Sequence, residues 1–133
     1  MRVLIVEDDF VSRKILHNFL SKYGECDIAV DGREAVEAFK MAMGDGAPYD
    51  LICMDIMMPR MNGQEALLQI RQLEAQAGIN ETDAVKVIMT TAVEDKKHVT
   101  EAFYKGGAAS YFVKPINKKK LIGELKILGL IDP

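Results

Sequence analysis

Short hydrophobic runs alternate along the chain with longer segments in which apolar residues recur every three or four positions. The short runs lack polar alternation and predict strands that are buried on both faces, as in parallel sheets. The longer segments predict amphipathic helices. The predicted strands cover residues 2–6, 26–30, 51–54, 85–90 and 109–113. Because a predicted helix follows each strand, we expect a parallel sheet with right-handed crossovers and helices on both faces.

Residues that favour helix N-termini precede three of the five predicted helices. They are Asp9, Asp31 and Asn117, whereas an Asn62-Gly63 turn is predicted before the third helix. The first helix is predicted over residues 10–22, and the fourth over residues 95–104. The apolar stripe predicted for the first helix consists of Val11, Ile15 and Phe19, with Leu16 and Leu20 beside them.

Asp55 stands at the end of a hydrophobic run, residues 51–54. Pro59 follows, and a proline cannot donate to a sheet ladder, so the strand must end before it. This places Asp55 at the carboxyl end of a central strand, where open α/β sheets bind their ligands. Taken alone, an aspartate there is as readily a turn cap as a functional residue.

Composition narrows the class of protein. The chain has 133 residues, enough for one domain, and its formal net charge is -3. This gives no electrostatic reason to bind nucleic acid or an acidic membrane. We find no apolar run of transmembrane length, no signal peptide and no second domain after the last helix. The chain has two cysteines, Cys26 and Cys53, so we do not expect a disulfide framework. We expect two reduced thiols in a cytoplasmic protein.

Polar residues follow four of the predicted strands. Glu7 and Asp8 follow the first, Asp55 the third, Thr91 the fourth and Lys114 the fifth. In a parallel sheet all strands have their carboxyl ends on one edge. The topology therefore predicts that three carboxylates, a hydroxyl and an ammonium meet at that edge.

Three carboxylates in one place need compensation. Two like charges about 4 Å apart repel by roughly 4 kcal/mol at an effective dielectric constant near 20, and one lysine cannot offset three such pairs. Either protons or a divalent cation must be bound, and an all-oxygen ligand set favours Mg²⁺. A carboxylate beside a metal, a lysine and a hydroxyl is suited to accept a phosphoryl group. A glycine-rich phosphate loop is absent, so a nucleotide donor is not indicated.

These motifs give the chain a family resemblance. Residues 4–8 (LIVED), 55–59 (DIMMP) with Asn62-Gly63, Thr91-Ala92, and residues 111–115 (YFVKP) occur in the right order. The chain resembles the response-regulator receiver domains of two-component signalling over nearly its whole length. It is similar to single-domain members such as the chemotaxis response regulator and sporulation-type phosphorelay shuttles. The resemblance implies a doubly wound, flavodoxin-like fold with five parallel strands in the order 2-1-3-4-5.

The resemblance also implies a role for each site residue. Asp55 corresponds to the phosphoacceptor, and the metal would be Mg²⁺. The metal ligands would be Glu7 (through water), Asp8, Asp55 and the backbone carbonyl of Met57. Thr91, Ala92 and Lys114 would contact the phosphate, Thr91 and Tyr111 would switch with it, and the Lys114-Pro115 bond is usually cis in the family.

The resemblance predicts a stand-alone phosphoacceptor that takes its phosphoryl group from a sensor histidine kinase or a histidine phosphotransfer protein. The fourth helix, fifth strand and last helix would then change to bind a downstream protein. Such a domain catalyses its own phosphorylation and dephosphorylation and is not otherwise an enzyme.

Three alternatives stay open. One is a relay shuttle that passes the phosphate to a histidine phosphotransfer protein. Another is an aspartyl-phosphate phosphatase of the haloacid-dehalogenase type, although that class needs a second aspartate where Met57 stands. The last is an interaction module that never takes phosphate.

Overall fold

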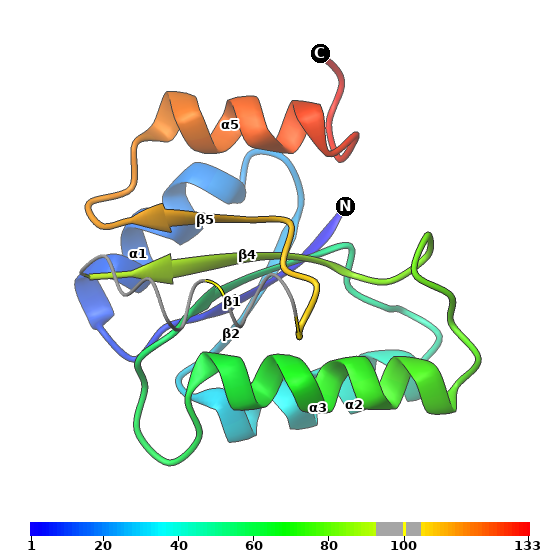
Figure 1. Cartoon of the computed structure of the whole chain (residues 1–133). Helices are drawn as coiled ribbons and strands as arrows, with labels where there is room; N and C mark the ends of the chain where they lie inside the picture. Colours follow the sequence, from blue (N-terminus) through cyan, green and yellow to red (C-terminus); the bar gives the residue numbers. More distant parts are fainter. Residues whose placement is uncertain (93–99, 101–104) are drawn as a thin grey trace.

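The fold is a five-stranded parallel sheet covered by helices on both faces (Figure 1). The computed structural model describes residues 1–92, 100 and 105–133. The strand order is β2-β1-β3-β4-β5, which confirms the predicted flavodoxin-like topology. The strands are β1 (Arg2–Val6), β2 (Glu25–Ala29), β3 (Leu51–Asp55), β4 (Lys86–Thr91) and β5 (Ser110–Val113).

Four helices are described, two on each face of the sheet. They are α1 (Phe10–Leu20), α2 (Gly32–Gly44), α3 (Gly63–Gln76) and α5 (Lys118–Ile127). In Figure 1, α5 lies above the sheet, α1 runs behind β4 and β5, and α2 and α3 lie below. The predicted helix over residues 95–104 falls on positions outside the described residues, apart from Thr100.

The side chains of each strand alternate between the two helical layers. On β1, Val3 and Ile5 pack with α1 and α5, whereas Leu4 and Val6 pack with α2 and α3. Every residue of β3 is buried, as predicted for a central strand with helices on both sides. Because both faces of these strands are buried, their sequences are continuously hydrophobic and do not alternate with polar residues.

The three predicted N-caps are confirmed, and Asn62, predicted only as a turn residue, also caps a helix. In each case the cap's side-chain oxygen accepts a hydrogen bond from the amide three residues later, which satisfies one of the free donors at the helix start. The pairs are Asp9 with Ser12 (2.8 Å), Asp31 with Glu34 (2.9 Å), Asn62 with Glu65 (2.9 Å) and Asn117 with Lys120 (3.0 Å).

The stripe predicted for the first helix is partly wrong. Leu16 and Leu20 are buried, but Val11 is 62% exposed and Ile15 is 38% exposed. The sequence has two adjacent apolar stripes at helical spacing, and only the one that includes Leu16 and Leu20 faces the sheet. Several boundaries also differ by one or two residues; for example, α1 ends at Leu20 and β4 runs one residue further, to Thr91.

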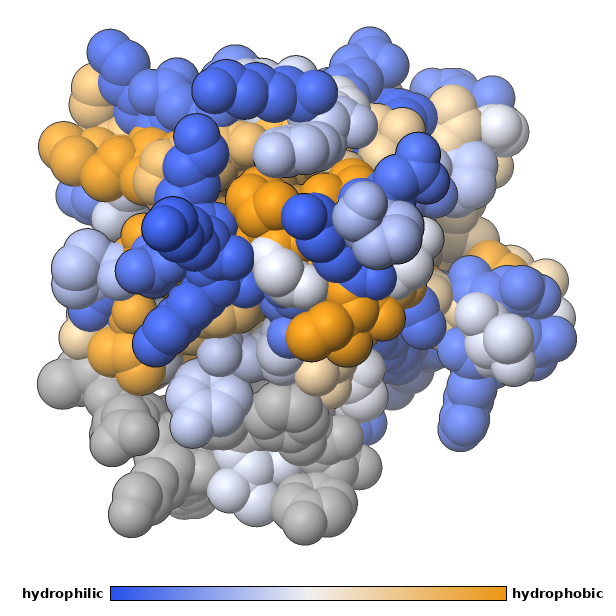
Figure 2. All heavy atoms as spheres, turned by 90° about the horizontal axis from the view of Figure 1, so that it is seen from above, coloured by the Kyte–Doolittle hydropathy of each residue, from blue (hydrophilic) through white to orange (hydrophobic). Residues whose placement is uncertain are grey.

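The surface above the sheet mixes charged and apolar groups. Figure 2 looks down on the α5 side and shows blue hydrophilic residues interspersed with orange hydrophobic ones. Lys118, Lys119 and Lys120 at the start of α5 are exposed.

None of the helices within the described ranges has the length and hydrophobicity needed to cross a bilayer.

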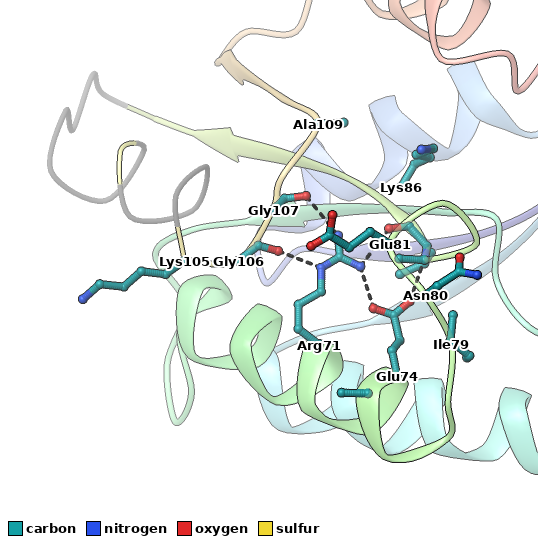
Figure 3. A pocket seen from close by; sticks show the side chains of 13 residues that line it. Arg71, Glu74, Ile79, Asn80, Glu81, Lys86, Lys105, Gly106, Gly107 and Ala109 are labelled. Carbon is teal, nitrogen blue, oxygen red and sulfur yellow. Dashed lines mark hydrogen bonds and ion pairs between the residues drawn. The ribbon is translucent and has the colours of Figure 1, made fainter.

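A buried ion pair that the sequence analysis missed closes the amino-terminal end of the sheet. Arg71 and Glu74 of α3 line a pocket of about 620 Å³ and pair at 2.7 Å (Figure 3). The Arg71 guanidinium also donates to the carbonyls of Val85, Gly106 and Gly107, at 3.0, 2.7 and 3.1 Å. Glu74 accepts from the Val85 amide at 2.7 Å. The pair therefore joins α3 to the segments that enter β4 and β5.

Candidate functional site at the carboxyl edge of the sheet

The topology brings the predicted polar residues to one edge. Glu7 and Asp8 follow β1 directly, Asp55 ends β3, Thr91 ends β4 and Lys114 follows β5. The strands reach this edge in register, since Val6 pairs with Met54, Asp55 with Thr90 and Thr91 with Val113. The amide of Lys114 also donates to the Thr91 carbonyl at 2.7 Å.

Lys114 joins two buried carboxylates. Its Nζ lies 2.6 Å from Oε2 of Glu7 and 3.3 Å from Oδ2 of Asp55. Glu7 is fully buried and Asp55 is nearly so. The close Lys114–Glu7 contact is an ion pair outside hydrogen-bonding angles, so Glu7 Oε2 has no hydrogen-bond partner in the described part of the chain. A buried oxygen in that state is available to a ligand.

The acidic residues of this edge are close enough to share a cation. Glu7, Asp8 and Asp55 each offer one carboxylate oxygen, and these three oxygens all lie within 4.8 Å of one another. Asp8 is exposed, which leaves a route from solvent to the two buried carboxylates. We call these three residues, together with Lys114, the acidic pocket.

The acidic pocket holds more negative charge than Lys114 can balance. Burial raises the pKa of Glu7 from 4.5 to about 7, although the contact with Lys114 acts in the opposite direction. Burial likewise raises the pKa of Asp55, again against the effect of Lys114. Burial alone would lower the pKa of Lys114, but its contacts with Glu7 and Asp55 outweigh this and raise it. The pocket therefore favours added positive charge, as a proton or a cation.

An all-oxygen set of three carboxylates, two of them buried, fits a hard divalent ion such as Mg²⁺. Glu7, Asp8 and Asp55 are the residues that could hold it. The amide of Met57 donates to Asp55 Oδ1 at 3.3 Å, so this residue lies beside the pocket. That its carbonyl binds the metal stays a prediction.

The remaining predicted residues also lie at this edge. Thr91 is buried at the end of β4, and the next residue, Ala92, is exposed. Tyr111 is partly exposed on β5. Their roles as phosphate and switch residues stay predictions, whereas the cis Lys114-Pro115 bond is confirmed.

Comparison with known sequences identifies the family. The family described as response regulator receiver domain matches residues 3–126. The chain belongs to this family. Receiver domains act in two-component signalling.

Chemotaxis proteins are among the relatives. The chain is 39% identical to the chemotaxis protein CheY of Treponema pallidum and 34% identical to that of Thermotoga maritima, over 91% and 93% of its length. It spans 77% and 93% of those proteins. It is also 36% identical to a hybrid signal transduction histidine kinase of Dictyostelium discoideum over 90% of its length, but spans 7% of that protein.

Solved structures agree with this placement. A chain in the CheX–CheY–BeF3–Mg²⁺ complex from Borrelia burgdorferi matches with a TM-score of 0.81 and 27% identity, covering 97% of this chain and 89% of that one. A chain in the co-crystal of the Saccharomyces cerevisiae phosphotransfer protein Ypd1 with the Ssk1 receiver domain matches with a TM-score of 0.81 and 32% identity. The coverage there is 99% of this chain and 93% of that one.

The sequence analysis missed the contacts of Arg60, which follows Pro59 in the loop after Asp55. Its guanidinium pairs with Asp31, a residue predicted only as a helix cap. The nearby Asn62-Gly63 indicates a turn in this loop. Nothing in the local pattern identifies a partner 29 positions away.

Proposed function

We propose that Asp55 accepts a phosphoryl group from a phosphohistidine of a sensor histidine kinase or a histidine phosphotransfer protein. The P–N bond of the donor breaks, a P–O bond forms to an Asp55 carboxylate oxygen, and the histidine nitrogen takes up a proton. The observation that carries this proposal is the acidic pocket, in which the Asp55 carboxylate lies 3.3 Å from Lys114 and beside two further acids.

A bound Mg²⁺ would neutralise charge on the transferring oxygens. Glu7, Asp8 and Asp55 would hold it, with the carbonyl of Met57. Lys114 is already placed at Asp55 and would stabilise the same oxygens once phosphate is attached. In this proposal the domain catalyses its own phosphorylation and dephosphorylation and has no separate substrate.

The readout follows from the added charge. A phosphoryl group brings oxygens that Thr91 and Lys114 can contact, and contacts made only to phosphate favour one of two conformations. Thr91 would move onto the phosphate and Tyr111 would turn inward. The surface that includes β5 and α5 would then bind a downstream protein.

Phosphotransfer to variants tests the proposal. Incubation with acetyl phosphate and Mg²⁺, or with a phosphorylated histidine kinase, should label the wild-type chain with acid-stable but alkali-labile phosphate. Asp55→Asn should remove the label, whereas Asp83→Asn, a change at an exposed aspartate, should leave it intact. Equal labelling of the Asp55→Asn chain would overturn the proposal, as would no labelling of the wild type.

A relay role has support from α1. Phe10, Val11 and Ile15 expose apolar side chains on this helix, which begins two residues after Asp8. The Ssk1 receiver domain, to which the chain is similar, was crystallised with a histidine phosphotransfer protein. We therefore infer that α1 contacts a phosphotransfer partner.

The double change Val11→Ser and Ile15→Ser should slow transfer to and from a phosphotransfer protein, while labelling by acetyl phosphate continues at the wild-type rate. Met41→Ser is the control, because Met41 is also an exposed apolar residue but lies on α2. Unchanged transfer in the α1 variant would contradict the inference.

A further inference from the structure

The loop between Asp55 and α3, residues 56–62, has an unusual backbone. Arg60 has a φ of 64° and is the one non-glycine residue with positive φ among those described. This conformation is uncommon for a residue with a long side chain, and it persists where surrounding contacts stabilise it.

Arg60 binds a buried carboxylate. Asp31 is 1% exposed, although it caps the start of α2. One of its oxygens accepts from the Glu34 amide, and the other accepts from Nε of Arg60 at 2.6 Å and pairs with a terminal guanidinium nitrogen. Both carboxylate oxygens of Asp31 are thus occupied, and Arg60 supplies the charge that balances it.

The backbone reinforces this contact. The amide of Gly32 donates to the Met61 carbonyl at 3.0 Å. A Cβ at position 32 would lie 2.4 Å from that oxygen, so only glycine allows the start of α2 to approach the loop so closely. The loop is also closed on itself, because the Gly63 amide donates to the Ile56 carbonyl at 2.8 Å. The Asp31–Arg60 pair and the Gly32–Met61 bond together fasten the loop to α2.

The same loop carries the predicted metal carbonyl. Met57 lies three residues before Arg60, and its amide already donates to Asp55. The Met57 side chain is 58% exposed and contributes little burial that could fix the loop. Besides the buried Ile56 and the core contacts of Met58 and Met61, the attachment to α2 holds the loop that carries the Met57 carbonyl.

We propose that the Asp31–Arg60 ion pair is a positioning device that sets the affinity of the acidic pocket for Mg²⁺ without contacting the metal or the phosphate. The role of the pocket in this proposal rests on the proposed function. Partners that orient metal ligands typically change metal affinity by 10- to 100-fold when removed. Since this pair acts through a loop of several residues, we expect an effect of about 10-fold, at the lower end of that range.

The test is a Mg²⁺ titration followed by backbone amide resonances. Arg60→Gln should weaken Mg²⁺ binding about 10-fold. Arg60→Gly should weaken it as much, because glycine keeps the positive φ but loses the ion pair, so this variant separates the pair from backbone strain. Arg33→Gln is the matched control, since it removes an exposed arginine near Asp31 and should leave the affinity unchanged.

Two further readouts exclude a merely structural effect. Asp31→Asn keeps the helix cap, and in combination with Arg60→Gln it should weaken Mg²⁺ binding no more than either change alone. At saturating Mg²⁺ the Arg60→Gln chain should be labelled by acetyl phosphate at the wild-type rate. Only the Mg²⁺ concentration needed for half that rate should rise.

Wild-type affinity in the Arg60→Gln chain, or equal losses in Arg60→Gln and Arg33→Gln, would overturn the positioning role. Those results would leave the proposed function intact, because the wild type would still bind Mg²⁺ and label on Asp55. A wild-type chain that binds no Mg²⁺ would instead overturn both proposals.

Discussion

Each end of the sheet has acidic side chains buried next to a basic residue, but the two ends differ in how fully these groups are paired. At the amino-terminal end, Arg71 and Glu74 satisfy each other, and their remaining hydrogen-bonding groups reach three carbonyls and an amide. At the carboxyl end, Lys114 serves two buried carboxylates, and one oxygen of Glu7 has no hydrogen bond within the described residues.

This difference separates a structural from a functional ion pair. A buried pair whose every group is bonded has nothing left to offer a ligand, so its removal should affect folding. A buried cluster in which one cation serves two carboxylates has excess charge, costs stability and is typical of a binding site. Buried acids beside a basic residue can therefore serve either structure or ligand binding. The number of their charges and hydrogen-bonding groups that lack a protein partner distinguishes the two cases.

The largest expected effect tests the amino-terminal pair. Arg71→Met leaves Glu74 buried without its cation and should lower the free energy of unfolding by about 3–5 kcal/mol. Lys40→Met is the control, because Glu37–Lys40 has the same spacing but is exposed, and it should cost less than about 1 kcal/mol. Urea denaturation measures both, and similar losses would contradict the comparison. Mg²⁺ affinity should be unchanged in both variants.

An opposite result is expected at the carboxyl end. Glu7→Gln removes one of two buried charges that share Lys114, so the metal-free protein at pH 8 should gain on the order of 1–3 kcal/mol of stability. The same change should sharply weaken Mg²⁺ binding. Urea denaturation and a Mg²⁺ titration measure the two effects. Lower stability together with unchanged Mg²⁺ binding would mean that Glu7 is a structural residue.

The pH dependence of stability gives a further test of the excess charge in the acidic pocket. The pKa of Glu7 is about 7 in the folded chain and 4.5 in the unfolded chain, so the folded state binds more protons between these values. This contribution to stability is full below about pH 4.5 and is lost as the pH rises through 7. Thermal unfolding without metal should therefore show a decline between pH 5 and 8 that is smaller in Glu7→Gln, where only Asp55 still has a raised pKa. Millimolar Mg²⁺ should reverse the decline in the wild type, and a flat profile would contradict the raised pKa.

The sequence was sufficient to predict most of the fold and the membership of the acidic pocket. Runs such as Leu51–Asp55 are buried on both faces. The parallel topology brings their carboxyl ends to one edge, independently of the side-chain contacts made there. Caps such as Asp9 and Asn117 act on amides three residues away, so local pattern identifies them.

Contacts between distant segments could not be predicted in this way. Arg71 reaches carbonyls at positions 85, 106 and 107, and Arg60 reaches Asp31, and neither spacing follows from a helix or strand period. The exposure of Val11 and Ile15 was missed for a related reason. Two apolar stripes on one helix compete for the sheet, and packing against the other elements decides between them.

The most direct test of the acidic pocket compares two neighbouring aspartates. Asp8 belongs to the pocket, whereas Asp9 caps α1 through the Ser12 amide, a role that asparagine can also fill. Calorimetric titration with Mg²⁺ at pH 8 should show binding by the wild type and by Asp9→Asn, and a large loss of affinity in Asp8→Asn. Equal affinities in the two variants, or no binding by the wild type, would contradict a metal site formed by Glu7, Asp8 and Asp55.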